Sequence, residues 1–466
     1  MNKIKFGTDG WRAVMCDEFT FANVRLVTQA IADHVGGRGT ILVGHDTRFL
    51  AEDFAAQAAE VLIGNGIPVE IVKGDVPTPV LAHAVLQRGC QGGVMFTASH
   101  NPPKYNGIKF IPHYGGPADD SITRSIEANL ARLTHEDVKR KPLAKGEDLL
   151  TWVELGDEYV DSVRTIVDFD GIARAGLRVV VDPMYGTGRK LLPRLLEEAG
   201  CVVDLIHADR DPLFGGLSPE PTEAQLQDLI RLVRENNAHL GLANDGDADR
   251  FGVIDTTGDF LSPNQVLVLL LAHLVENKGW RGDVVRTVAT THMLDRQAAH
   301  YGLTLHETPV GFKHICQLML KGEVLIGGEE SGGLSIGPHI PEKDGLLACL
   351  LLAELRAVEG KSLTAILGDI MEEVGGSYSA RLDMHLPGNK KEELMAAARD
   401  VEGSWQGRRI LRRIDVDGIK WIFADDSWCL IRPSGTEPLV RIYLEGADQE
   451  ALEGLKKDAL AFVDAL

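Results

Sequence analysis

The chain has 466 residues, of which 44% are hydrophobic and 25% are charged, and this composition is typical of folded globular proteins. At about 100–150 residues per domain, its length predicts three or four domains. The formal net charge of −20 at pH 7 argues against a nucleic acid or an anionic membrane as a partner, because such surfaces would be repelled. A phosphorylated small molecule would be repelled too, unless the protein gathers arginine and lysine side chains locally.

The cysteines and the apolar stretches indicate where such a chain resides. The six cysteines form no CxxC pair, which favours reduced thiols and a cytoplasmic location. The first residues lack the apolar core of a signal peptide. The most apolar stretches, near residues 266–275 and 346–352, are shorter than the ~20 residues that span a bilayer, so we expect two buried helices there.

One hydrophobic pattern occurs three times along the chain, over residues 41–72, 177–206 and 284–306. Each copy is an apolar run, a polar turn, an amphipathic helix followed by glycine, and a second apolar run. This succession is typical of a strand–helix–strand unit with helices on the faces of a sheet. It predicts three similar α/β domains with mixed sheets.

Beyond residue 370 the pattern changes. Residues 379–386 alternate between apolar and polar, a helix is expected over 392–401, short strands follow, and the chain closes with apolar residues at helical spacing. These features predict a separate C-terminal α+β domain. The expected domains therefore cover residues 1–153, 154–256, 257–370 and 371–466.

The first segment with catalytic character is Thr-Ala-Ser-His-Asn-Pro-Pro at residues 97–103, directly after an apolar run. Ser99 is expected on a loop at the end of a strand, where two prolines stiffen the exit. A serine held in this way can act as a nucleophile or carry a phosphoryl group. An ordinary polar turn is the alternative, because serine and Asn-Pro are common in turns.

Three aspartates at alternate positions, Asp245, Asp247 and Asp249, also follow an apolar run. Such carboxylates can converge on one hard cation, and Mg²⁺ is favoured because it shares its ligand shell with phosphate oxygens. A calcium-binding EF-hand loop fits less well, since Arg250 stands where that loop needs glycine and Thr256 where it needs glutamate. A solvated acidic turn is the remaining alternative.

Two further segments suit the two ends of a sugar phosphate. Glu329 and Ser331 lie in a loop rich in glycine, where the backbone can approach a ligand closely and the side chains suit sugar hydroxyls. Arg432, Ser434, Gly435 and Thr436 lie between two strand-like runs and could form a phosphate cradle. A plain loop or turn is the alternative for each.

These four segments, with residues 6–12, resemble the α-D-phosphohexomutase superfamily of phosphoglucomutases, phosphomannomutases and phosphoglucosamine mutases. The resemblance covers the whole chain and implies four domains around one central cleft, each contributing one loop. It implies a phosphoserine at Ser99 and a Mg²⁺ held by Ser99, Asp245, Asp247 and Asp249. It further implies a sugar-binding loop with Glu329 and Ser331 and a distal phosphate loop with Arg432, Ser434, Gly435 and Thr436. The basic residues that match the family's cleft are Arg12, Lys109, Arg250 and Lys313.

The resemblance also implies the reaction. Hexose 1-phosphate and hexose 6-phosphate would be interconverted through phosphoserine and a hexose 1,6-bisphosphate, with glucose 1,6-bisphosphate as intermediate and activator. The general base stays open: Lys109 would need a lowered pKa, Arg12 is a poor proton acceptor, and His100 adjoins the phosphoserine. The expected partner is a small sugar phosphate, and the chain is expected to be a monomer or a homodimer.

The sugar loop departs from one common family pattern at Gly333, where many bifunctional members carry histidine. The Glu329-Glu330-Ser331 sequence resembles phosphoglucomutases, so we expect glucose phosphate to be preferred and mannose phosphate to be accepted, with His339 or Lys343 supplying the missing polar group. Phosphoglucosamine mutase and a phosphoserine-type sugar phosphatase are the alternative enzymes. A sugar-phosphate sensor without catalysis would not require both Ser99 and the three aspartates.

Overall fold

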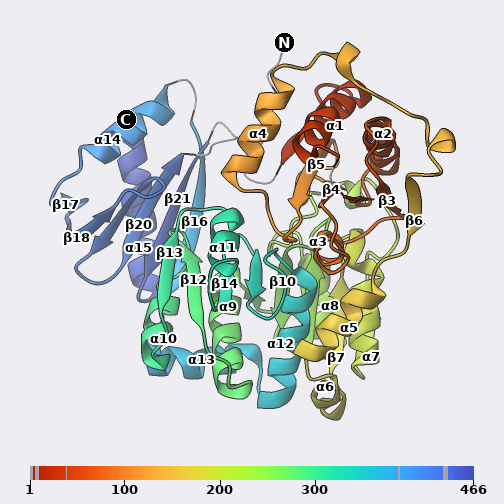
Figure 1. The fold of residues 1–466 in the computed structure, drawn as a ribbon. Coiled ribbons are helices and arrows are strands. Elements are labelled where there is room, and N and C mark those ends of the chain that lie inside the picture. Colours follow the sequence, from red (N-terminus) through yellow and green to blue (C-terminus); the bar gives the residue numbers. More distant parts are fainter. Residues whose placement is uncertain (1–3, 6–9, 38, 387–388, 434–438, 466) are drawn as a thin grey trace.

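The computed structural model describes residues 4–5, 10–37, 39–386, 389–433 and 439–465. Its strands form four sheets that follow one another along the chain, each with its own helices (Figure 1). The first three sheets mix parallel and antiparallel pairs, whereas the pairs of the fourth are antiparallel. The predicted class, three similar α/β domains and a C-terminal α+β domain, is confirmed. The exact boundaries at residues 153, 256 and 370 stay a prediction.

The first sheet has the strand order β1-β5-β4-β2-β3-β6. Its strands are β1 (Trp11–Val14), β2 (Ile41–His45), β3 (Val69–Val72), β4 (Gly92–Phe96), β5 (Tyr105–Pro112) and β6 (Leu150–Val153), and its helices are α1 (Phe21–Val35), α2 (Ala51–Gly64), α3 (Thr78–Gln87) and α4 (Asp120–Leu130), with short 3₁₀ turns at His135–Asp137 and Leu143–Lys145. Successive side chains of a strand point to opposite faces. Accordingly, Ile41 and Val43 pack with α1, α2 and α4, whereas Leu42 packs with α3 on the other face.

The second sheet has the order β11-β10-β9-β7-β8. It contains β7 (Arg178–Asp182), β8 (Val202–Leu205), β9 (Leu240–Asn244), β10 (Phe251–Asp255) and β11 (Phe260–Leu261), with helices α5 (Asp157–Ile166), α6 (Phe169–Ala175), α7 (Leu191–Glu198) and α8 (Gln227–Glu235) and 3₁₀ turns at Thr187–Arg189 and Phe214–Gly216. Val180 of β7 packs towards α8, while Val179 and Val181 join the cluster that contains α7. The same alternation therefore places one helical layer on each face.

The third sheet has the order β13-β12-β14-β15. It contains β12 (Asp283–Thr287), β13 (Leu305–Thr308), β14 (Val324–Gly328) and β15 (Leu334–Ile336), with helices α9 (Pro263–Ala272), α10 (Met293–Tyr301), α11 (Phe312–Met319), α12 (Gly345–Glu359) and α13 (Leu363–Val374) and a π-helical turn at His273–Asn277. The two apolar stretches of the sequence form α9 and α12, most of whose residues are buried. Across the described residues, no helix is long and apolar enough to cross a membrane.

The fourth sheet has the order β16-β21-β20-β19-β18-β17. It contains β16 (Tyr378–His385), β17 (Ser404–Trp405), β18 (Arg408–Ile414), β19 (Ile419–Phe423), β20 (Trp428–Pro433) and β21 (Leu439–Gly446), and its helices are α14 (Lys390–Arg399) and α15 (Gln449–Asp464). One face of the sheet packs on these helices in a core of its own. The other face meets Val288 and Ala289 of the third domain in a small cluster.

The first three domains are packed together more extensively than the fourth. A single apolar cluster runs through α3 of the first domain, α5 and α7 of the second, and α9 and α12 of the third. The fourth domain, blue in Figure 1, lies beside the third and keeps a separate core. Its position therefore depends on the small apolar cluster and on polar contacts between the two domains.

Candidate active site

The predicted functional loops occupy equivalent places in their sheets. In each α/β domain the loop connects a parallel strand to its antiparallel neighbour: Ser99 follows β4, the three aspartates follow β9, and Glu329 follows β14. The segment that follows β20 also connects an antiparallel pair, but Ser434, Gly435 and Thr436 lie outside the described residues. The order of the motifs along the sequence thus corresponds to one repeated position in the fold.

Ser99 adopts an unusual conformation at the centre of this arrangement. Its side chain is buried, and its φ of 49° lies in the left-handed region that non-glycine residues rarely occupy. Its backbone N–H donates to Oγ1 of Thr97 at 2.8 Å. Its hydroxyl donates to Oδ2 of Asp245 at 2.6 Å and lies 3.4 Å from Nδ1 of His100. The serine of the first domain is therefore held against the acidic loop of the second.

The three aspartates form a compact buried cluster. One carboxylate oxygen from each of Asp245, Asp247 and Asp249 lies within 4.8 Å of the other two. Burial, followed by the charges of Asp247 and Asp249, raises the pKa of Asp245 well above its ordinary value. Burial opposes the ionisation of Asp247, but Lys109, a hydrogen bond from Thr78 and Lys343 outweigh it and lower its pKa. The three carboxylates therefore repel one another, and the nearby lysines offset part of this repulsion.

These carboxylates fit a hard cation. Oδ1 of Asp247 and Oδ1 of Asp249 are buried and have no hydrogen-bond partner within the described part of the chain. Buried carboxylate oxygens are normally satisfied, and oxygen ligands of this type are those that Mg²⁺ binds. The donor set and its unsatisfied oxygens are therefore those expected of a Mg²⁺ site that also includes the hydroxyl oxygen of Ser99.

Two lysines from different domains compensate part of the negative charge. Nζ of Lys109, on β5, lies 3.0 Å from Oδ2 of Asp249 and 3.3 Å from Oδ2 of Asp247. Nζ of Lys343, just before α12, lies 2.7 Å from the same oxygen of Asp249. Both lysines are almost fully buried. Lys343, which was expected to serve the sugar loop, therefore also contacts the aspartate cluster.

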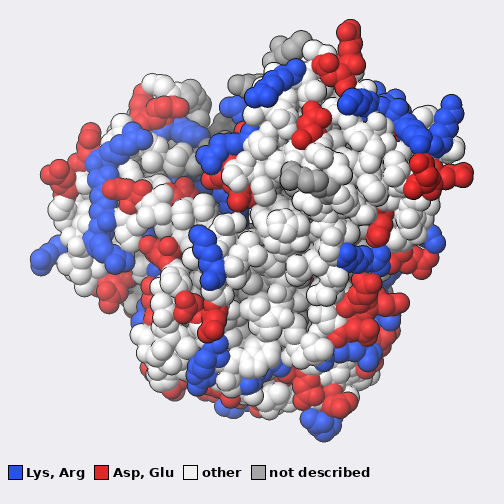
Figure 2. All heavy atoms as spheres, in the orientation of Figure 1, with Lys and Arg blue, Asp and Glu red and all other residues white. Residues whose placement is uncertain are grey.

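Four cations act on His100, and two of them, Arg12 and Arg250, were predicted from the sequence. Burial, followed by the charges of Arg250, Arg12, Arg48 and Lys343, lowers the pKa of His100 well below its ordinary value. Nη1 of Arg12 donates to the side chain of Asn101 at 2.9 Å. On the molecular face in Figure 2, by contrast, acidic and basic side chains are interspersed around an uncharged middle. The local gathering of cations that the negative net charge requires is therefore present at Ser99.

The sugar loop is anchored by its first glutamate. Oε1 of Glu329 accepts a hydrogen bond from the backbone N–H of Gly311 at 2.9 Å. The neighbouring N–H, that of Val310, donates to Oδ2 of Asp417 at 3.0 Å, and the same oxygen accepts from Nε of Arg432 at 2.8 Å. A short chain of contacts therefore connects the predicted sugar loop with Arg432 of the predicted phosphate loop.

Lys313 lies farther along the same segment, on α11, and its Nζ is 2.6 Å from Oδ1 of Asp120 on α4. This ion pair joins the third domain to the first. The described contacts do not bring Lys313 to the three aspartates, whereas Lys109 contacts two of them.

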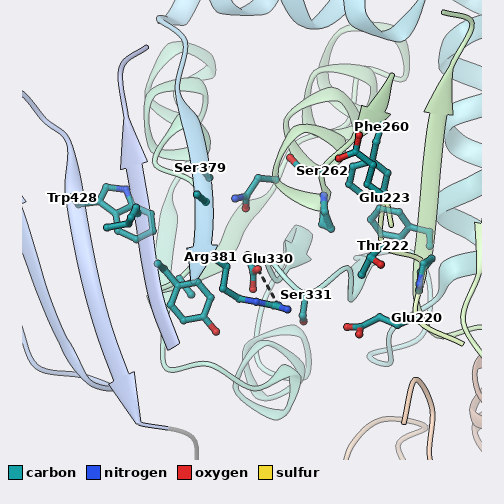
Figure 3. Close-up of a pocket in the computed structure, with 18 residues that line it drawn as sticks. Glu220, Thr222, Glu223, Phe260, Ser262, Glu330, Ser331, Ser379, Arg381 and Trp428 are labelled. Carbon is teal, nitrogen blue, oxygen red and sulfur yellow. Dashed lines mark hydrogen bonds and ion pairs between the residues drawn. The ribbon is translucent and has the colours of Figure 1, made fainter. Parts of the chain in front are cut away.

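A cavity of about 310 Å³ lies beside the sugar loop where three domains meet. Figure 3 shows Glu220 from the second domain, Ser331 from the third and Arg381 from the fourth around it. Arg381, on β16, reaches Glu330 of the sugar loop at 3.3 Å, and this ion pair is drawn as a dashed line. The fourth domain is therefore connected by charge to the loop expected to hold the sugar.

Sequence reasoning left three site residues without a firm role. Arg48 follows β2 and holds the Ser99 loop, Thr78 begins α3 and donates to Asp247, and Lys343 reaches Asp249. Parallel strands end at the same sheet edge, so the residues after β2 could have been placed beside those after β4. The contacts of Thr78 and Lys343 join separate domains, and no local pattern signals them.

Comparisons with known proteins agree with this geometry. The chain matches the family models described as phosphoglucomutase/phosphomannomutase alpha/beta/alpha domain I at residues 3–137, domain II at 157–258, domain III at 262–374 and the C-terminal domain at 386–461. It is 33% identical to a protein of Methanosphaera stadtmanae named a probable phosphoglucosamine mutase, with 98% of each chain covered. It is 30% identical to a phosphoglucomutase of Komagataeibacter xylinus, with 100% of this chain and 91% of that one covered.

A solved structure gives the same result for the fold. The crystal structure of a candidate phosphomannomutase from Thermus thermophilus matches with a TM-score of 0.87 and 35% identity, covering 99% of both chains. The family models, the full-length relatives and this structure all point to one assignment. The chain belongs to the phosphoglucomutase/phosphomannomutase family of the α-D-phosphohexomutase superfamily and is a phosphohexomutase-type isomerase.

Proposed function

We propose that this protein interconverts hexose 1-phosphate and hexose 6-phosphate through a phosphoserine at Ser99. The observation that carries the proposal is the hydroxyl of Ser99, 2.6 Å from Asp245 inside a buried cluster of three aspartates and two lysines. A nucleophile beside carboxylates that suit Mg²⁺ is what phosphoryl transfer requires. The same conclusion would not follow from the serine loop alone.

Mg²⁺ would be held by Ser99, Asp245, Asp247 and Asp249 and would neutralise charge on the transferring phosphoryl group. The protein's own cations add to this effect. Lys109, Arg12 and Arg250 lie at the serine and acidic loops, where they would stabilise negative charge on the phosphoryl oxygens. The nearness of Lys109 to two carboxylates argues against its acting as the base while they are charged. The lowered pKa of His100 keeps its ring neutral but also makes it a weak acceptor for the proton of the substrate hydroxyl, so both residues stay candidates for the base.

The bisphosphate intermediate would have to turn around between the two half-reactions. Glu329 and Ser331 would bind the adjacent O3 and O4 hydroxyls in both orientations. Arg432, Ser434, Gly435 and Thr436 would hold the far phosphate, and Lys313 would also contact the substrate. Glucose and mannose share these hydroxyls and differ at C2. We therefore propose glucose phosphate as the preferred substrate and mannose phosphate as a second one, with glucose 1,6-bisphosphate as the activator.

A second candidate substrate is glucosamine phosphate. The name of the relative from Methanosphaera stadtmanae supports it, and so does the pair of carboxylates, Glu329 and Glu330, in the sugar loop, since these would attract an ammonium group. Conversely, Glu330 already pairs with Arg381, which reduces that attraction. We keep glucosamine phosphate as the alternative that the substrate test must rank.

The remaining proposals concern the protein as a whole. Six free cysteines, of which only Cys16 is exposed, support a reducing compartment such as the cytoplasm. We propose a monomer or homodimer that acts on small sugar phosphates and binds neither nucleic acid nor membrane. The domain boundaries at residues 153, 256 and 370 belong to the same proposal.

The decisive experiment incubates the protein with Mg²⁺, glucose 1-phosphate and a trace of glucose 1,6-bisphosphate while phosphorus NMR follows the phosphate groups. We expect glucose 6-phosphate to appear and Ser99→Ala to slow its formation by about a thousandfold or more. Mannose 1-phosphate and glucosamine 1-phosphate under the same conditions rank the sugars. Inorganic phosphate as the main product would instead identify a phosphatase, and the absence of any change would contradict the proposed reaction.

A further inference from the structure

Arg48 binds the backbone of the Ser99 loop through its guanidinium group. Its guanidinium donates to the carbonyl oxygens of Ser99 and Asn101 at 2.6 Å each and to those of Pro102 and Tyr105 at 3.0 Å each. The side chain is fully buried. One residue therefore donates to three carbonyl groups of a loop that contains two prolines and to that of Tyr105, the first residue of β5, where few backbone N–H groups are available as donors.

The guanidinium is itself fixed in place. Oδ2 of Asp46 accepts from Nε of Arg48 at 3.1 Å, and Oδ1 accepts from its backbone N–H at 2.9 Å. The backbone N–H of Asp46 donates to the carbonyl of Phe96, the last residue of β4. The ring of Phe214, from the second domain, lies 5.0 Å from the guanidinium carbon. Arg48 is therefore held by contacts with Asp46, with the serine loop and with Phe214.

The acidic loop also restricts the position of the Ser99 carbonyl, on the side opposite Arg48. A Cβ added to Gly246, in the acidic loop, would lie 2.8 Å from the carbonyl oxygen of Ser99. The serine loop is thus pressed between Arg48 and the backbone of the loop that carries the three aspartates. Because Ser99 has a left-handed φ, release of its carbonyl would allow its backbone to relax and its hydroxyl to leave Asp245.

We propose that Arg48 is a positioning residue that sets the direction of the Ser99 hydroxyl and thereby the rate of phosphoryl transfer. This inference rests on the proposed function. In the described contacts Arg48 touches neither the three aspartates of the metal cluster nor the sugar loop, and it meets the site through the backbone of the serine loop. Its charge also acts on His100, and Arg48→Lys keeps that charge while losing the four carbonyl contacts. Its loss should reduce the rate at which Ser99 accepts and returns phosphate and should leave sugar binding nearly unchanged.

The test compares the wild type with Arg48→Lys and Arg48→Gln, neither of which can reproduce four carbonyl contacts. Arg286→Met is the matched control, because Arg286 is an equally buried arginine that pairs with Asp295 and Glu307 in the third domain. Three quantities are measured: KM and kcat for glucose 1-phosphate, transfer of phosphate from glucose 1,6-bisphosphate to Ser99 by intact mass, and thermal unfolding. Rates are expressed per folded molecule.

We expect both Arg48 variants to transfer phosphate about a hundredfold more slowly with a KM close to that of the wild type, since a displacement of about 1 Å can cost that much. Arg286→Met should lose thermal stability and keep its rate. If Arg48→Lys or Arg48→Gln kept a rate within about threefold of the wild type, the inference alone would be overturned. A wild type that never carries phosphate on Ser99 would overturn the proposed function and this inference with it.

Discussion

Oγ1 of Thr78 donates a 2.6 Å hydrogen bond to Oδ2 of Asp247, and the backbone N–H of Thr78 donates to the carbonyl of the same residue at 2.9 Å. The first turn of α3 in the first domain thereby fixes the acidic loop of the second. It occupies one oxygen of the carboxylate, whereas Oδ1 has no partner among the described residues. The domain contact therefore decides which oxygen is available to a cation.

The first prediction concerns this contact and metal affinity. Thr78→Val should weaken Mg²⁺ binding by about 10–100-fold, which is the usual effect of removing a partner of a metal ligand, and Asp247→Asn should weaken it at least as much. Titration calorimetry and the Mg²⁺ concentration that gives half-maximal activity measure the effect. Asp228→Asn removes the same charge from an exposed helix of that domain and should change neither value. Unaltered affinity in Thr78→Val would contradict the role of the contact.

The second prediction concerns Gly333, where the chain departs from a common pattern of its family. A Cβ at this position would lie 2.5 Å from Cδ of Lys343 and 2.9 Å from its Cγ. Gly333→Ala must therefore displace Lys343, whose Nζ is 2.7 Å from Asp249. We expect kcat to fall about tenfold or more, within the range usual for a displaced catalytic-site group.

A double-mutant cycle shows whether the effect of Gly333→Ala passes through Lys343. If it does, Gly333→Ala in a Lys343→Met background should cause little further loss, because residues in contact are not additive. Gly368→Ala is the control, since nothing lies within 4 Å of a Cβ there and the residue is inside α13. Additive losses in the cycle would show that Gly333 matters for another reason.

Local patterns predicted much of the fold. The three strand–helix–strand copies correspond to β2-α2-β3, β7-α7-β8 and β12-α10-β13. The glycines that follow these helices, Gly66, Gly200 and Gly302, all have a left-handed φ, which explains why glycine occurs there. Periodicity and turn residues suffice for such features because the forces that decide them act within a few residues.

Contacts between distant segments could not be predicted in this way. The ion pair of Lys343 with Asp249 joins residues 94 positions apart, and the hydrogen bond of Thr78 with Asp247 joins residues 169 positions apart. Such contacts follow from the packing of whole domains on a shared core. The resemblance to a known family identified the serine and the aspartates, but it assigned Lys343 only a loose role and Thr78 none.

The third prediction concerns the ion pair between Glu330 and Arg381, which connects the sugar loop to the fourth domain. Both side chains are partly exposed, and the two groups are 3.3 Å apart, so the pair should contribute about 0.2–1 kcal/mol. Glu330→Gln should therefore raise KM for the sugar phosphate about two- to fivefold with little change in kcat. Steady-state kinetics measure both values.

Asp383→Asn serves as the matched control for that experiment, because Asp383 contacts the other side of the Arg381 guanidinium at 3.2 Å without touching the sugar loop. Its KM should stay close to that of the wild type. Equal increases of KM in both variants would mean that Arg381 acts within its own sheet and that the connection to Glu330 is not used.

The fourth prediction concerns Lys420 of β19, which is fully buried between the third and fourth domains. Its Nζ donates to the carbonyl of Val288 at 2.7 Å and lies 2.8 Å from Nε2 of His292. Burial, followed by the charge of Arg286, lowers the pKa of Lys420 to about 7, although Glu307, Glu445 and Asp295 oppose the shift. Burial and Lys420 together also lower the pKa of His292, which leaves that ring neutral.

The sign of the pH dependence follows from this depressed pKa. An unfolded chain binds the lysine proton up to about pH 10.4, whereas the folded protein releases it near pH 7, so the unfolded state binds more protons between these values. Stability should rise with pH by at most about 1.4 kcal/mol per pH unit from this one group. Below pH 7 both states are protonated, and Lys420 destabilises the fold to a constant extent.

The difference in the free energy of unfolding between the wild type and Lys420→Met, measured at several pH values, separates the contribution of Lys420 from those of all other titrating groups. Three of the six tryptophans, Trp405, Trp421 and Trp428, lie in the fourth domain, so tryptophan fluorescence during denaturant unfolding includes a large contribution from it. We expect the free energy of unfolding of the wild type, relative to Lys420→Met, to rise by about 1–2 kcal/mol between pH 7.5 and 9. Lys73→Met removes an exposed lysine paired with Glu154, and its free energy of unfolding relative to the wild type should not change with pH. A flat or falling difference for Lys420→Met as well would mean that Lys420 keeps its proton in the folded protein, and that the two domains stay in contact through a buried charge.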